Sequence, residues 1–154
     1  MAYGNFIASV PFPQIAALRA DPNVLLRPSR MENVSHLLAY WVQAQPLGRL
    51  LGEALDGGER LADGLEHPLR PPVMHRPLEV RRLLHVLREA LHQATAANRV
   101  REIHWFGSDI DKLLAVFEHA AGHGEAVVSV LEPPFDEERG AKVKIPFDAT
   151  APGG

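Results

Sequence analysis

The segment from Leu78 to Ala97 constrains the fold most, because its apolar residues recur at the period of an α-helix. The residues that share one face are Val80, Leu83, Leu84, Leu87, Leu91 and Ala94. Such a pattern predicts a long amphipathic helix whose apolar face packs on a core. A chain of 154 residues is large enough to build that core without disulfides or metals.

The N-terminal half predicts a strand and three further helices. Strand formers fill Tyr3 to Val10, and a helix of about two turns follows around Pro13 and ends at Asp21. Ser29 to Glu32 has the S-x-x-E form of a capping box, which predicts a helix from Ser29 to Pro46. This helix would place Met31, Val34, Leu38 and Trp41 at helical spacing. The third helix contains Leu47 to Leu55 and ends at Gly57.

Prolines and glycines remove any periodicity between Gly57 and Pro77, so a long loop is expected there. After the long helix, Val100 to Gly107 is interpreted as a connector. A last helix is predicted from Ser108 to Gly122, and the β-branched run from Glu125 to Leu131 predicts a buried strand.

These elements predict a single α+β domain with about five helices packed around a small sheet, in which the N-terminal strand pairs with the strand near Val127. The domain is expected to span residues 1–132. Residues 133–154 form a tail with an edge strand over 142–147 and a frayed C-terminus. An exposed edge strand there leaves both a monomer and a homodimer open.

Composition excludes several classes of function. The chain has no cysteine, so disulfides, thiolate zinc sites and cysteine nucleophiles are absent, and a cytoplasmic location is expected. No run of apolar residues is long enough for a membrane span, so no membrane association is expected. No G-x-S-x-G motif or complete phosphate-binding loop occurs, which favours a protein that is not an enzyme.

Several blocks of residues suggest a relationship to a known family. They are Gly4 to Val10 followed by Gln14 to Pro22, then Leu50-Leu51-Gly52 with Gly57-Gly58-Glu59, then Pro77 to Val80, and Val116 to Val128. Together they resemble the YfbM-like family of uncharacterised bacterial proteins. Where members of that family often carry a Trp-His pair, this chain reads Ser35-His36, with the tryptophan displaced to Trp41. The resemblance implies an α+β cytoplasmic protein and no established reaction, cofactor or substrate.

Basic residues on the long helix form a candidate binding surface. One side of that helix carries Arg81, His85, Arg88 and His92, with Arg99 at its end, and the first four are here called the basic ribbon. Trp105, in the most aromatic part of the sequence, is added to it as a candidate contact. The ribbon either docks an acidic protein partner or is a solvated face that pairs with the acidic C-terminal third of the chain. The net charge of −3 and the few nearby aromatic residues argue against nucleic acid.

Histidines offer a second set of candidates. His119 and His123 are four residues apart, which suits either a metal pair, with Glu118, Glu125 or His104 as further ligands, or polar residues at a helix end. The second interpretation is simpler, so we expect no metal and no cofactor. A pocket formed by His36, His104 and Glu125 would instead support a small-ligand-binding protein or an enzyme.

Two functional hypotheses follow. The first, which the sequence favours, is a non-catalytic protein-binding module, such as an adaptor or an antidote to a toxin, that acts through the basic ribbon and the proline-rich loop from Pro68 to Pro77. The second is a small-ligand-binding protein or enzyme with a histidine and carboxylate pocket. Convergence of two histidines and a carboxylate in a concave pocket would favour the second hypothesis.

Overall fold

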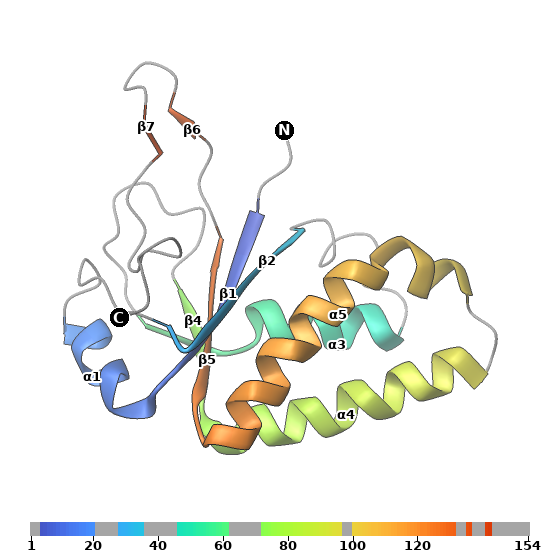
Figure 1. Ribbon diagram of the computed structural model, residues 1–154, viewed down its shortest axis with the longest axis horizontal. Coiled ribbons are helices and arrows are strands. Elements are labelled where there is room, and N and C mark those ends of the chain that lie inside the picture. Colours follow the sequence, from blue (N-terminus) through green and yellow to red (C-terminus); the bar gives the residue numbers. More distant parts are fainter. Residues whose placement is uncertain are drawn as a thin grey trace.

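The computed structural model describes residues 4–20, 28–35, 46–61, 72–96, 100–131, 135–136 and 141–142 (Figure 1). The elements follow the order β1 (Gly4–Val10), α1 (Phe12–Ala20), β2 (Arg30–Ser35), α3 (Pro46–Asp56), β3 (Glu59–Arg60), β4 (Val73–His75), α4 (Pro77–Ala96), α5 (Val100–His123), β5 (Ala126–Leu131), β6 (Phe135–Asp136) and β7 (Ala141–Lys142).

Five of these strands form one antiparallel sheet in the order β2-β1-β5-β4-β3. In its middle, β1 lies beside β5, with Ser9 opposite Val127. The α+β class is therefore confirmed, as is the pairing of the N-terminal strand with the strand near Val127.

The sheet separates two apolar clusters. Figure 1 shows α3, α4 and α5 on one side of the sheet and α1 on the other. Alternate residues of each strand point to opposite faces, so Ile7 and Val127 join the cluster under the three helices, whereas Ala8 and Val128 join Ile15 of α1. Phe117, the largest fully buried side chain among the described residues, belongs to the cluster under the three helices. The apolar face predicted for the long helix is confirmed. Its buried residues are Val80, Leu83, Leu84, Leu87 and Ala94, and Leu91 packs partly buried against the same cluster.

The predicted helix from Ser29 to Pro46 is wrong over residues 30–35, which form β2. Their main chain pairs with β1 from Gly4↔Ser35 to Ser9↔Arg30, and the Ser29 N–H donates to the Ser9 carbonyl at 2.7 Å. Pairing with a long partner strand thus outweighs the local capping signal. Residues 36–45, which include His36, Leu38 and Trp41, lie outside the described part of the chain.

The segment from Gly57 to Pro77 also differs from the loop that was expected. It contains β3 and β4, and β4 is buried along its whole length between β3 and β5. A strand of three residues that is inaccessible on both faces carries no alternation of polar and apolar residues. Residues 62–71 lie outside the described ranges.

The last helix begins at Val100 and not at Ser108, so the predicted connector from Val100 to Gly107 is helical. The described residues contain four helices instead of about five, and residues 30–35 of the expected second helix form β2.

In the tail, Ala141–Lys142 pairs with Phe135–Asp136 in a separate two-stranded ribbon. The remainder of the expected edge strand, residues 143–147, lies outside the described part. None of the described helices combines the length and apolar character that crossing a membrane requires.

Candidate functional site

The end of α5 brings three ionisable side chains together. Gly124 has a φ of +64°, a conformation that glycine adopts without strain, and it reverses the chain just after His123. The Glu125 N–H then donates to the Ala120 carbonyl at 2.9 Å, which is the hydrogen bond of a Schellman motif. This turn places Glu125 beside the last turn of α5, at the entry to the central strand β5.

Glu125 is buried, with 7% of its surface exposed. The Ser9 hydroxyl, from β1, donates to its Oε1 at 3.1 Å. The Ser29 hydroxyl, just before β2, donates to its Oε2 at 2.5 Å. Both carboxylate oxygens are thus held by hydroxyl groups from distant parts of the chain, which fixes the orientation of the carboxylate.

The two histidines of α5 lie next to this carboxylate. His119 Nε2 is 3.2 Å from Glu125 Oε1, but their relative orientation does not make a hydrogen bond, and this buried nitrogen has no hydrogen-bond partner. The rings of His119 and His123 stack with their centroids 4.1 Å apart and their planes 23° apart. His123 Nδ1 lies 2.8 Å from the His119 carbonyl oxygen, so it carries the proton and donates.

These residues line a pocket of about 430 Å³. Its walls come from the start of α1, from Ser29 and from the end of α5: Pro11, Phe12, Pro13, Ser29, His119, His123, Gly124 and Glu125. The volume lies in the range that small-molecule sites occupy. Apolar surface from Phe12 and the two prolines therefore faces the same space as the imidazoles and the carboxylate.

Of the three residues predicted for a histidine and carboxylate pocket, Glu125 is in this one. His36 lies outside the described residues, and the His104 backbone belongs to α5 while its side chain is outside the description. The histidines that accompany Glu125 in the pocket are His119 and His123. Their four-residue spacing, just before Glu125, is the sequence feature that indicates this grouping. Nothing in the sequence points to Ser9, Ser29 or Phe12, which reach the site only through the fold.

The basic ribbon is exposed on α4, as expected for either of its interpretations. Arg88 pairs with Glu118 of α5 at 3.0 Å, so one of its members contacts the acidic C-terminal third of the chain. The backbone of Trp105 lies within α5, and its side chain is outside the description.

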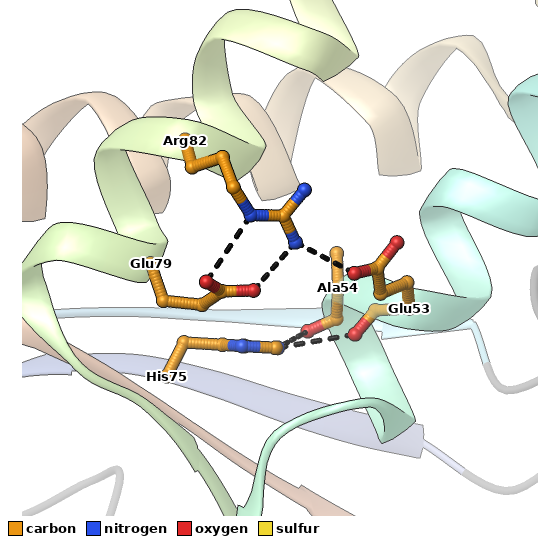
Figure 2. Close-up of polar contacts among 5 residues, drawn as sticks. All are labelled: Glu53, Ala54, His75, Glu79 and Arg82. Carbon is orange, nitrogen blue, oxygen red and sulfur yellow. Dashed lines mark hydrogen bonds and ion pairs between the residues drawn. The ribbon is translucent and has the colours of Figure 1, made fainter.

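A second polar cluster joins α4, β4 and the end of α3 (Figure 2). The buried His75 ring points its Nε2 at the carbonyl oxygens of Glu53 and Ala54, at 3.1 and 3.2 Å. Burial lowers the pKa of His75, although the two carbonyls oppose this shift. Nε2–H of the neutral ring can donate to both carbonyls, and the Glu53 carbonyl also accepts from the Gly57 N–H at 2.9 Å.

Arg82 lies on the solvent side of this cluster. Its guanidinium group donates two hydrogen bonds to Glu79 and one to Glu53, at 2.7 Å for the latter (Figure 2). The hydrogen bond with Arg82 is the main cause that lowers the pKa of Glu79. The arrangement connects α4 to α3, and its groups are engaged with one another, so we assign it a structural role.

No known protein-family model matches the chain, and no match was found among curated proteins or solved structures. The resemblance to the YfbM-like family therefore stays a prediction, carried by the residues quoted for it above.

Proposed function

We propose that this chain is a small-ligand-binding protein, and that its ligand occupies the pocket between α1 and the end of α5. The observation that supports this proposal is the convergence of His119, His123 and Glu125 on one concave surface. Three polar side chains beside an apolar wall are the usual composition of a small-molecule site. The proposal includes no reaction.

The lining indicates what such a ligand should look like. Phe12 is 43% exposed although it is large and apolar, and it lies on the pocket wall. An aromatic or aliphatic part of a ligand would cover it and gain free energy from the area removed from water. The polar end of the ligand would face the imidazoles and Glu125.

Fragment binding tests the proposal. The full chain, labelled with ¹⁵N, is titrated with benzamide, benzylamine and benzohydroxamate, and backbone amide shifts are followed by NMR. We expect at least one fragment to shift the amides of Phe12, Gly124 and Glu125. Phe12→Ala should weaken this binding about tenfold, the equivalent of about 1.4 kcal/mol.

Leu78→Ala is the matched control for Phe12→Ala. Leu78 is also a large exposed hydrophobic residue, but it lies on α4 and does not line the pocket. Its loss should leave fragment affinity unchanged. The proposal is refuted if no fragment shifts the pocket amides at millimolar concentration, or if both substitutions weaken binding equally.

A protein-binding module that acts through the basic ribbon remains the second candidate. The exposure of Arg81, His85, Arg88 and His92 on one helix favours it. An acidic protein surface would be the matching partner, because arginine forks bind carboxylates. The pocket has no role in this candidate, which is why we place it second.

A further inference from the structure

We propose that the pocket binds a divalent first-row transition metal of the Zn²⁺ type, with His119, His123 and Glu125 as its ligands. The inference rests on the proposed function, since the metal would be part of the site that receives the small ligand. The donor atoms of these three residues all lie within 4.8 Å of one another. A set of two histidines and one glutamate is a known ligand set for zinc with an open position.

The contact between His119 and Glu125 is the first argument. His119 Nε2 is buried without a hydrogen-bond partner, although a carboxylate oxygen is 3.2 Å away. That nitrogen has a single in-plane direction for its proton or its lone pair, and this direction misses the carboxylate oxygen, so neither protonation state of Nε2 makes a hydrogen bond with Glu125. Leaving a buried polar atom unsatisfied costs about 1–3 kcal/mol. A cation between the two atoms would satisfy both.

The hydrogen bond of His123 is the second argument. Since Nδ1–H donates to the His119 carbonyl, the other nitrogen, Nε2, has a free lone pair. Histidine ligands commonly donate their second N–H to a carbonyl or carboxylate, which orients the ring and sets its tautomer. His123 is exposed and lines the pocket, and its ring is held by this hydrogen bond and by stacking on His119.

One of the donor-atom distances matches a tetrahedral ion. With metal–ligand bonds of about 2.0–2.1 Å, two ligand atoms of a tetrahedron lie about 3.3 Å apart. The 3.2 Å between His119 Nε2 and Glu125 Oε1 already matches that edge. The imidazoles are stacked with their centroids 4.1 Å apart, so both can point at one ion only if the His123 ring moves away from His119 when the metal binds.

The surroundings of Glu125 resemble the outer shell of a metal site. The hydroxyl groups of Ser9 and Ser29 hold its two oxygens in place from β1 and from the start of β2. A buried carboxylate is normally paired or bound to a metal. With three protein ligands, the fourth position of the ion would be open to the small ligand. Nitrogen donors also exclude Mg²⁺ and Ca²⁺, which prefer oxygen.

Metal titration of the full chain tests the inference. After removal of metals with EDTA, the protein is titrated with Zn²⁺ by isothermal calorimetry, and with Co²⁺ while its visible absorption is recorded. We expect one Zn²⁺ per chain at this site and cobalt bands typical of tetrahedral coordination. His123→Ala should lower the Zn²⁺ affinity about 100-fold or more, and Ser29→Ala about tenfold.

His85→Ala is the matched control, because His85 is an exposed histidine on α4 outside the pocket. Its loss should leave Zn²⁺ affinity unchanged. His123 is exposed, so its substitution should not unfold the chain, which circular dichroism would verify. Mg²⁺ should give no heat. The inference is overturned if Zn²⁺ does not bind, or if it binds equally well to His123→Ala and to the wild type.

The fragment titration separates the two proposals when it is repeated with and without Zn²⁺. Fragment shifts at the pocket without any Zn²⁺ binding would support the small-ligand site and overturn the metal. Zn²⁺ binding that depends on His123, with no fragment bound in either condition, would support the metal and refute the small-ligand site.

Discussion

His75 should make the stability of this protein depend on pH in a defined direction. Its ring is 3% exposed, contacts the carbonyls of Glu53 and Ala54, and lies 6.2 Å from the Phe117 ring between centroids. Burial holds the pKa of His75 below its value in an unfolded chain, which is about 6.5. The folded protein therefore keeps this histidine neutral at a pH where the unfolded chain has already protonated it.

The sign follows from the number of protons bound. Between the lowered pKa of His75 and about pH 6.5, the unfolded state binds more protons, so the free energy of unfolding falls as the pH falls. One proton accounts for a slope of at most about 1.4 kcal/mol per pH unit. Above that window His75 contributes no slope, and below the folded pKa the slope ends because both states are protonated.

The substitution His75→Gln isolates this effect. An amide N–H₂ keeps the donors for the Glu53 and Ala54 carbonyls but does not titrate. The free energy of unfolding of both proteins is measured by urea denaturation at several values between about pH 5 and pH 7.5. We expect the difference between wild type and variant to shrink as the pH falls, with the wild type losing stability faster.

His85→Gln controls for the general effect of removing a histidine, since His85 is exposed on α4. Its stability curve should run parallel to that of the wild type. Parallel curves for His75→Gln and the wild type would refute the argument, because they would mean that the buried histidine takes up its proton at the same pH as the unfolded chain.

Two further predictions concern the sheet and the basic ribbon. Gly58→Ala should lower the free energy of unfolding by about 1–3 kcal/mol in urea denaturation, because the added Cβ would lie 2.5 Å from the Met74 carbonyl oxygen. Gly52→Ala is the control. A Cβ there would have no atom within 4 Å, so this substitution in a helix should be neutral or stabilising. Equal effects of the two would contradict the clash. Arg81→Glu combined with Arg88→Glu should leave the circular dichroism spectrum unchanged and abolish capture of any partner found by pull-down with the wild type. An unchanged set of captured proteins would count against the ribbon as a docking surface.

The parts of the fold that the sequence predicts correctly are those with long, regular patterns. The helix α4 shows this best, because twenty residues with one amphipathic period are compatible with a helix and not with a strand. Local signals mislead where a distant partner intervenes. Ser29 and Glu32 look like a helix cap, yet β1 offers a full strand to pair with, and the Ser29 hydroxyl bonds to Glu125 instead.

The candidate site likewise contains residues that a local sequence pattern indicates and residues that only the fold brings together. The spacing of His119, His123 and Glu125 is visible in the sequence because one helix end supplies all three. Ser9 and Ser29 are 116 and 96 residues away from Glu125, and no local pattern connects them. Pro11 and Phe12 line the pocket because the chain leaves β1 next to the end of α5, which places the start of α1 there.

The position of β5 also determines when the sheet can be completed during synthesis. β5 is the central strand, and it is the last of the five to leave the ribosome. Until then β1 and β4 each have a free side, and contacts as remote in sequence as Val10 with Ala126 must wait for it. Pairings of such long range are slow to form, so the nascent chain carries two unpaired strand sides until residue 131 has emerged.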